Sequence, residues 1–277
     1  MKSSLARLRR ALTVWRIIAL VLAAVIVVVA LGAPLWSSHG PQAQDYRNTF
    51  AGLGSPGHPL GTDAFGRDIL ARLAHGLRTE LVIALSATAL AAVIGTAFGL
   101  LGGWFRGWAE ILTMRVTDIV LAFPTIVLAL LVVTIAGAGT GTLIGVLAVL
   151  FAPAYARLVY GQVLSVRRAE YVEAELAIGT GTGRVLLRNV LPNVAAPVLV
   201  QLSLTMAAAI LLESGLSFLG LGVVPPAPSL GLMIAEGQRF LADAPAALTV
   251  PTVTVVLTIL AFGVVGDTLR DWLDPRR

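Results

Sequence analysis

The longest uncharged stretch of the chain limits its possible folds more than any other feature. Residues 119–156 contain no Asp, Glu, Lys or Arg. The hydrocarbon core of a membrane is ~30 Å thick and is crossed by ~20 apolar helical residues. As a single helix at ~1.5 Å per residue, this stretch would be ~57 Å long, nearly twice that thickness. It therefore has to fold back, and the Gly/Thr-rich segment 137–142 predicts the turn.

Other apolar runs of spanning length complete the pattern. Besides the helices expected near 118–136 and 141–160, they are Ile17–Trp36, Leu81–Phe105, Val194–Leu212 and Ala244–Gly266. The first has a basic start like a secretory signal peptide, but its apolar run exceeds the 7–15 residues of such peptides and no clean cleavage site follows. We therefore expect a retained helix, and in total an all-α membrane protein with six transmembrane helices. Prolines within or beside these spans, at positions 124, 153 and 197, are expected to bend them.

The charge distribution supports this fold class and predicts an orientation. Charged residues make up 13% of the 277 residues and hydrophobic residues 57%, whereas a soluble domain carries ~25% charged residues. Cytoplasmic loops are enriched in Lys and Arg. With the N-terminus inside, 15 of the 20 lysines and arginines fall inside and 5 outside. Both termini and the loop 161–193 are thus predicted to be cytoplasmic, and the net charge of +5 reflects topology rather than a nucleic-acid partner.

The predicted outer loop, residues 37–80, has two parts. Residues 37–62 contain three prolines and several glycines and are expected to be irregular. From Asp63 onward an amphipathic helix is expected, because apolar residues recur every four positions, at Phe65, Ile69, Leu73 and Leu77, with charged residues between them. Such a helix suits an elbow lying at the membrane surface and leading into the second span.

Nucleotide hydrolysis through a phosphate-binding loop is excluded. That loop needs a Gly-Lys-Ser/Thr step whose lysine reaches the phosphates. The chain has one lysine, Lys2, and its Gly-rich run 179–183 is followed by Arg184.

Metal and thiol chemistry are not expected either. The chain has no cysteine, which excludes disulfides. Its three histidines, His39, His58 and His75, are spaced 19 and 17 residues apart. This spacing gives no recognisable ligand set, so we expect no metal site and no cofactor.

The loop 161–193 is the most distinctive polar segment. Glycines at positions 179, 181 and 183 interrupt its helical pattern, since glycine is poor in helix interiors and allows positive φ. We expect one helix near 162–178 and a second near 184–190, which either ends near Pro192 or starts the next span. Taken alone, this pattern also suits an ordinary amphipathic loop.

The same loop resembles the cytoplasmic coupling loop of ABC importer permeases, which reads Glu-Ala-Ala, three residues, Gly, and closes on a hydrophobic residue with Leu-Pro. The residues that fit are Glu173, Ala174, Gly179, Leu191 and Pro192, whereas Glu175 stands where a small residue is usual. The resemblance implies a role in coupling to an ATPase for these six residues and for the neighbouring Glu170 and Gly181.

From about residue 58 onward, the chain is similar to the second permease subunit of the peptide/nickel group of ABC importers. Four segments carry the resemblance: 58–68 (HPLGTDAFGRD), 118–124 (DIVLAFP), 213–226 (ESGLSFLGLG through Pro-Pro) and 266–275 (GDTLRDWLDP). The resemblance implies a type I ABC importer permease core, here a permease domain over 81–270. An N-terminal part, 1–80, with the first span and the elbow helix would precede it, and a cytoplasmic tail, 271–277, would follow.

The resemblance further implies the partners and the location. These are a homologous second permease subunit, one or two cytoplasmic ATPase subunits and an extracytoplasmic solute-binding protein, in the cytoplasmic (inner) membrane of a bacterium. The ATPases would act on the loop near 170–180 and switch the bundle between inward-open and outward-open states. Di- or oligopeptides are the expected solute, with nickel, metal chelates or glutathione as alternatives. An ion-coupled secondary transporter or a channel is a rival, but those usually carry charged groups at mid-membrane, unlike these uncharged cores.

Three acidic residues lie at the edges of predicted spans. Asp118 and Asp267 are expected at cytoplasmic ends, where hydration or a helical pair such as Arg115 with Asp118 accounts for them. Glu213 is expected near the outer end of the fifth span, either on the permeation path or as an anchor for the loop 214–230. Glu213 and Asp118 are the candidate pathway or gate residues.

Overall fold

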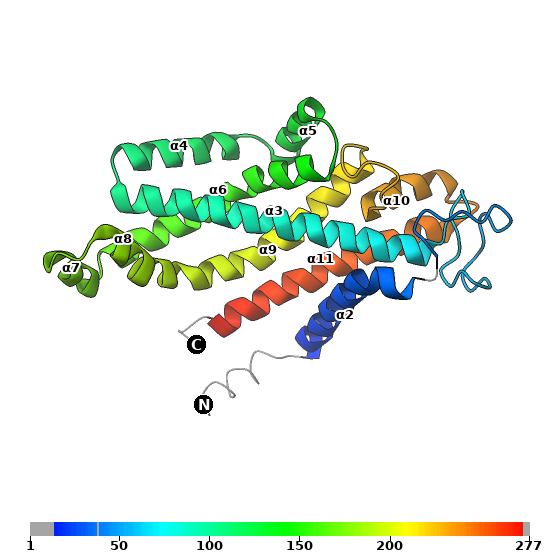
Figure 1. Ribbon diagram of the computed structural model, residues 1–277, viewed down its shortest axis with the longest axis horizontal. Helices are drawn as coiled ribbons and strands as arrows, with labels where there is room; N and C mark the ends of the chain where they lie inside the picture. The colour runs from blue at the N-terminus through cyan, green and yellow to red at the C-terminus, as the bar shows by residue number, and fades with distance from the viewer. Residues whose placement is uncertain (1–13, 38, 274–277) are drawn as a thin grey trace.

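The computed structural model describes residues 14–37 and 39–273, and within them all named elements are helices (Figure 1). In chain order they are α2 (Val14–Trp36), α3 (Ile69–Phe105), α4 (Trp108–Ala122), α5 (Thr125–Ala136), α6 (Thr140–Arg167), α7 (Glu170–Ala177), α8 (Thr182–Val185), the π-helix η1 (Leu186–Val190), α9 (Leu191–Phe218), α10 (Leu230–Gly237), the 3₁₀ turn η2 (Gln238–Phe240) and α11 (Pro245–Leu273). Five spans are long and apolar enough to cross a membrane: α2, α3, α6, α9 together with α8 and η1 ahead of it, and α11. The pair α4 and α5 makes a sixth when counted as one broken span. The all-α membrane fold is confirmed.

The third span is broken, so the prediction of one helix over 118–136 is wrong. The helix begins earlier, at Trp108, and α4 and α5 meet at an angle of 94°. The cause is Pro124, because the residue before a proline is driven out of the helical region. Phe123 accordingly has φ −93° and ψ 143° and ends α4. The prolines at 153 and 197, by contrast, lie inside the continuous helices α6 and α9.

The prediction of an elbow helix that begins at Asp63 is also wrong. The helix starts at Ile69 and runs without a break into the second span, so a boundary between residues 80 and 81 falls inside α3. Residues 63–68 form a turn instead, in which the Asp63 carboxylate accepts hydrogen bonds from the backbone N–H groups of Phe65 and Arg67 and Gly66 has φ +70°. Side-chain bonds of this kind favour turns over helix. The segment before it, through residue 62, is irregular, as expected.

Arg72, one of the charged residues between the apolar positions of the expected elbow helix, is 3% exposed and ion-paired rather than on a solvent-facing side. Its guanidinium contacts the carboxylates of Asp63 and Glu236, the latter at 2.9 Å, and Arg67 reaches Glu236 at 2.7 Å. This network fastens α10 to the start of α3. Asp68 caps α3 by accepting from the backbone N–H of Ala71 at 2.8 Å.

Small residues let α3 and α6 pack closely along the bundle (Figure 1). A Cβ added to Gly95 would meet the carbonyl oxygen of Ala152 at 2.3 Å, and one added to Gly99 would meet Val159 Cβ at 2.6 Å. Glycine is thus required at these two positions because the neighbouring backbone occupies the space of a side chain. The glycines of the second span therefore serve packing within this chain.

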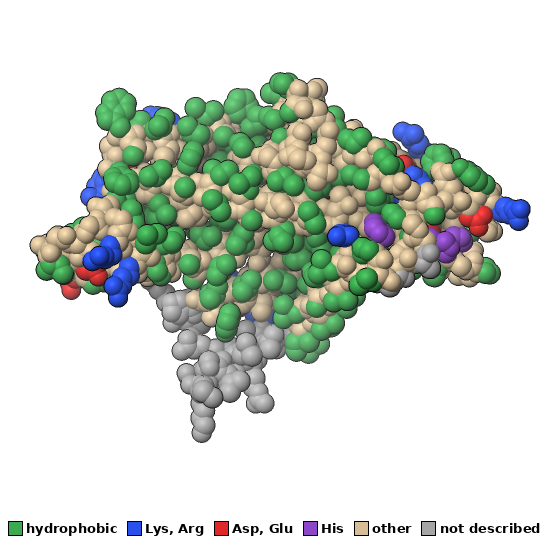
Figure 2. All heavy atoms as spheres, viewed as in Figure 1, with side chains coloured by type: hydrophobic (Ala, Val, Ile, Leu, Met, Phe, Trp, Pro, Cys, Tyr) green, Lys and Arg blue, Asp and Glu red, His purple; other side chains and the backbone are tan. Residues whose placement is uncertain are grey.

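Charge is concentrated at the two ends of the bundle. Figure 2 shows hydrophobic side chains over the length of the face in view, with charged and histidine side chains gathered toward the ends. One end carries the segment 39–68 with α10, here called the loop end, and the other carries α7 and α8, here called the α7 end (Figure 1). The start of α2 and the end of α11 are joined by an ion pair between Arg16 and Asp271 at 2.7 Å.

Candidate functional site

The predicted coupling residues are gathered at the α7 end of the bundle (Figure 1). The helix expected over 162–178 is interrupted, because α6 continues to Arg167 and the chain turns at Ala169, which has extended φ −73° and ψ 135°. This turn places Val172 of α7, which is fully buried, in an apolar cluster. The cluster contains Trp104, Val159, Val163, Val172, Val185, Val190 and Val194.

Polar contacts hold this end together from three elements. The Arg167 guanidinium donates to the backbone carbonyl of Trp104 at 2.7 Å and lies 5.7 Å from the centre of its ring. The side-chain amide of Asn193, at the start of α9, donates to the hydroxyl of Tyr171 on α7 at 3.2 Å. The helix α7 is therefore in contact with both neighbouring spans, α6 and α9.

Gly179 ends α7 in a Schellman motif. The N–H of Thr180 bonds to the carbonyl of Glu175 at 3.0 Å, and the N–H of Gly179 bonds to that of Leu176 at 3.0 Å. The motif requires a left-handed residue, and Gly179 has φ +85°. Gly181, with φ −64°, starts α8 instead. The helix break predicted from the glycines is therefore present, with Gly179 as the residue that needs to be glycine.

The surface of α7 is open to a partner. Glu170, Glu173, Ala174, Gly179, Gly181 and Pro192 are exposed, whereas Glu175 and Leu191 are partly buried. Tyr171 and Ile178 add apolar surface at 50% and 81% exposure. Glu170 and Glu173 lie in the first turn of α7, where carboxylates interact favourably with the helix dipole. A protein with basic groups around a shallow apolar patch would fit this face.

The second predicted helix of the loop does not end near Pro192. The chain passes through α8 and η1 directly into α9, in which Pro192 is the second residue. Proline is tolerated there because the π-helix η1 already interrupts the regular α-helical bonding: the N–H of Leu191 bonds to the carbonyl of Leu186, five residues earlier. Of the two outcomes that the sequence left open, the structure shows the one in which this segment starts the next span.

Asp118 lies deeper in the bundle than predicted. It is the eleventh residue of α4, ~15 Å from the start of that helix. Its carboxylate pairs with Arg157 on α6 at 2.8 Å, with side chains 50% and 57% exposed, respectively. Among the described residues, Asp118 forms no ion pair with Arg115. Its carboxylate is paired instead with the Arg157 guanidinium on α6. Asp267, near the end of α11, is exposed.

Glu213 belongs to a buried polar cluster between α3 and α9. Its carboxylate accepts from the Ser217 hydroxyl at 2.7 Å, and Ser217 in turn accepts from the backbone N–H of Val223 at 3.1 Å. The Ser214 hydroxyl donates to Glu80 of α3. Glu80 and Glu213 are both 0% exposed. Through Ser217, these contacts connect Glu213 to Val223 in the loop that follows α9.

Glu80 is the residue that sequence reasoning missed. It stands one position before the uncharged run 81–105 and was assigned to the elbow. The sequence does indicate that Glu80 is buried, because its helical spacing puts it on the same side of the helix as Ile69, Leu73 and Leu77, which are all buried. Only the continuity of α3 shows that this side faces α9.

A groove with both apolar and polar lining residues opens near the α7 end, between α6, α9 and α11. Its volume is about 730 Å³. Polar side chains in its lining are Gln162, Asn193, Gln201 and Arg270. No other polar side chains line it among the described residues. The groove combines amide groups and one guanidinium, which suit a solute with amide and carboxylate groups.

Comparison with known proteins gives a consistent result. Residues 95–277 match the family model described as "Binding-protein-dependent transport system inner membrane component". A dipeptide transport system permease protein of Alkalihalophilus pseudofirmus is 36% identical over 94% of this chain and 85% of the relative. A di/tripeptide transport system permease protein of Pseudomonas aeruginosa is 40% identical over 91% and 84%. A glutathione transport system permease protein of Pectobacterium atrosepticum is 38% identical over 80% and 74%.

Solved structures share the fold. A chain of the MetNI methionine ABC transporter in inward-facing conformations aligns with a TM-score of 0.60 at 19% identity, covering 73% of this chain and 96% of that one. A chain of an amino acid ABC transporter structure with histidines aligns with a TM-score of 0.56 at 12% identity, covering 72% and 92%.

Proposed function

The chain belongs to the family of binding-protein-dependent transport system inner membrane components, and from that premise we propose that it forms part of the membrane path of an importer for di- and oligopeptides. It is the permease of an ABC importer, and the role of this chain is transport. The relatives named for dipeptides and di/tripeptides support the solute class.

The observation that carries this proposal is the way α7 is held. Val172 is buried in the bundle, while Glu170, Glu173 and Ala174 face outward. An ATPase subunit docking on this exposed face would move a helix that is packed against α6 and bonded to α9. That arrangement supports an ATPase on a separate chain, as does the absence of a Gly-Lys-Ser/Thr step around Lys2.

The groove supports the solute class. A peptide offers amide groups and a terminal carboxylate, and the groove offers three side-chain amides and Arg270. Guanidinium–carboxylate pairs are among the stronger hydrogen-bonded pairs. A homologous permease subunit would close the open side of the groove, and an extracytoplasmic binding protein would deliver the peptide to the loop end.

The orientation we propose places the α7 end in the cytoplasm. It rests on the distribution of 15 lysines and arginines inside and 5 outside. The Arg16–Asp271 pair supports it, because it puts the start of α2 and the end of α11 on one side of the bundle. The location follows as the cytoplasmic membrane of a bacterium, with both termini inside.

Reconstitution in liposomes tests the function. The chain, its partner permease, the ATPases and the binding protein are combined, and uptake of a labelled dipeptide is measured with ATP inside or outside. We expect uptake only with all components and ATP on the α7 side. The purified chain alone should not hydrolyse ATP. Hydrolysis by this chain after removal of contaminating ATPases would contradict the proposal.

Glutathione is the second candidate solute, because a glutathione permease is 38% identical to the chain. Glutathione is itself a short peptide with two carboxylates, so the same groove chemistry applies. Competition separates the two: excess glutathione should leave dipeptide uptake unchanged if dipeptides are the solute. Nickel and metal chelates are tested in the same assay as unlabelled competitors.

A further inference from the structure

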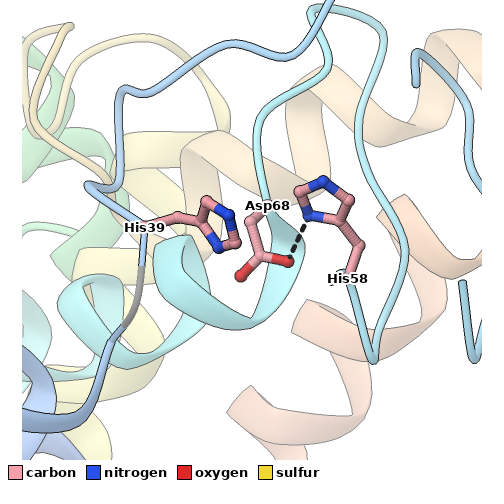
Figure 3. A group of neighbouring side chains, drawn as sticks. All are labelled: His39, His58 and Asp68. Atoms are coloured by element: carbon pink, nitrogen blue, oxygen red, sulfur yellow. Dashed lines mark hydrogen bonds and ion pairs between the residues drawn. The ribbon is translucent and has the colours of Figure 1, made fainter. Parts of the chain in front are cut away.

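Two histidines and an aspartate that are distant in sequence meet at the loop end (Figure 3). His39 lies just after α2, His58 lies in the irregular segment, and Asp68 is the N-cap of α3. One ligand atom from each lies within 4.8 Å of the others. In Figure 3 the Asp68 carboxylate sits between the two imidazole rings.

We propose that His39, His58 and Asp68 bind a divalent transition-metal ion of the Zn²⁺ class. Two imidazoles and one carboxylate are a common ligand set for Zn²⁺, with an open position for water. Ni²⁺ and Cu²⁺ accept the same donors, whereas Mg²⁺ prefers oxygen ligands. This site would be a resident one and is separate from any solute in the groove at the other end.

The distances are close to those a metal needs. Tetrahedral Zn²⁺ with bonds of ~2.0–2.1 Å places its ligand atoms ~3.3 Å apart. His58 Nδ1 and Asp68 Oδ1 are 3.1 Å apart, and the ring centres of His39 and His58 are 5.0 Å apart. All three ligand atoms lie within 4.8 Å of one another, so the proposed metal would have to draw His39, which is only partly buried, closer to the other two ligands.

Two of the three ligands, His58 and Asp68, are held in place before a metal arrives. Asp68 uses its second oxygen to accept from the Ala71 N–H at 2.8 Å, which fixes the carboxylate at the helix start. His58 and Asp68 are each 5% exposed. Asp45 Oδ2 lies 3.9 Å from His58 Nε2 and accepts from Asn48 at 2.7 Å through the same oxygen. At this distance Asp45 makes no hydrogen bond to His58, but its carboxylate adds negative charge around a cation.

A simple hydrogen-bonded pair of histidine and aspartate would explain the contact between His58 and Asp68 but not the position of His39 beside them. The third group, His39, comes from the segment that leaves α2, so a metal would tie that segment to the start of α3. The bound metal would thus close a loop over the 28 residues that lie between His39 and Asp68. Holding this stretch fixes the first helix against the permease core at the loop end.

Metal binding is tested on the full-length, untagged chain in detergent, stripped with a chelator and titrated with Zn²⁺ against a competing indicator. We expect one equivalent of bound Zn²⁺, measured also by mass spectrometry after desalting. His39→Gln should lower affinity at least about tenfold, since even outer-shell substitutions cost 10–100-fold. His75→Gln is the matched control, because His75 bonds its own helix at Ala71 O (3.0 Å) and lies outside the cluster.

A second measurement gives a positive signal. The native chain has no cysteine, so His39→Cys loaded with Co²⁺ should show a thiolate-to-cobalt charge-transfer band, and His75→Cys should not. Circular dichroism and elution volume establish that each variant is folded. Binding of Zn²⁺ by His39→Gln with wild-type affinity, or no stoichiometric binding by the wild type, would overturn the site. A band in both cysteine variants would reduce it to adventitious binding.

Discussion

Asn193 at the start of α9 donates its side-chain amide to the hydroxyl of Tyr171 on α7, with 3.2 Å between Nδ2 and Oη. The two residues join the exposed helix to a span whose other end carries Glu213. The distance from Asn193 to Glu213 along α9 is ~30 Å at ~1.5 Å per residue. A rigid α9 would therefore connect the α7 end with the buried cluster around Glu80.

Tyr171→Phe tests this connection. The substitution removes the hydrogen bond and keeps the ring. An exposed bond of this kind is worth ~0.5 kcal/mol at the low end of the usual range, so we expect about a twofold drop in peptide taken up per ATP hydrolysed, with hydrolysis itself retained. The measurement is the ratio of uptake to phosphate release in liposomes. Tyr46→Phe, on the irregular segment, is the control and should leave the ratio unchanged.

We predict that replacing Gly179 with proline abolishes ATP-driven uptake and that replacing it with alanine reduces uptake. Gly179 has a φ of +85°, which proline cannot adopt because its ring fixes φ near −65°. For other L-residues this conformation costs ~1–2 kcal/mol. Gly179→Pro should abolish ATP-driven uptake while membrane insertion persists, and Gly179→Ala should reduce it partly. Gly183→Ala is the control, since a Cβ there meets nothing within 4 Å and φ is not positive. Normal uptake by Gly179→Pro would show that the break is a passive loop.

Gly99→Ala should destabilise the bundle. The new methyl group would lie 2.6 Å from Val159 Cβ and 2.7 Å from the Ala156 carbonyl oxygen, and overpacking of this kind typically costs ~1–3 kcal/mol. We expect a lower midpoint of thermal unfolding in detergent. Gly145→Ala, on the facing helix α6 with nothing within 4 Å, should be neutral or slightly stabilising. Equal midpoints for the two variants would refute the close α3–α6 contact.

Single cysteines test the proposed orientation without background, because the chain contains none. Thr49→Cys and Ser165→Cys are both exposed, at opposite ends of the bundle. An impermeant maleimide added to intact cells should label Thr49→Cys and should label Ser165→Cys only after permeabilisation. The reverse labelling would invert the topology.

Glu175 is predicted to form an ion pair with an Arg or Lys on the cognate ATPase, at the rim of the α7 face. Its side chain is partly buried, and an exposed pair is worth ~0.2–1 kcal/mol. Glu175→Ala should weaken assembly slightly at low salt and not at high salt, as read from ATPase co-purification across a salt series. A salt-independent gain in assembly and transport would instead mark Glu175 as a tolerated misfit.

The sequence predicts which segments are apolar and long enough to span a membrane. It predicts poorly where the helices begin, where they bend and which of them are in contact. Uncharged runs predicted every long span, because burial in lipid demands them. The start of α3 at Ile69 depended on hydrogen bonds from the Asp63 side chain, which compete locally with a helix that has the right apolar period. The 94° break follows from Pro124 through the extended conformation of Phe123. The presence of a proline does not by itself predict such a break, since Pro153 and Pro197 lie within unbroken helices.

The candidate sites divide in the same way. The glycine break of the coupling loop was readable because its conformation is local to α7. The partners of Asp118 and Glu213, and the meeting of His39 with His58, depend on which faces of distant segments touch. Residue spacing carries no information on such contacts, so Arg157, Glu80 and Asp68 were found only in the folded chain.

The bend between α4 and α5 has a consequence for what surrounds it. The last carbonyl groups of a helix have no partner within the helix, and in hydrocarbon each unsatisfied backbone group costs several kcal/mol. Residues 121–127, which include the bend, are exposed when the chain is considered without partner subunits. Acyl chains cannot hydrate those carbonyls, whereas water or another polypeptide can. We therefore expect the side of the bundle that carries the bend to face water or a partner chain rather than lipid in the assembled transporter.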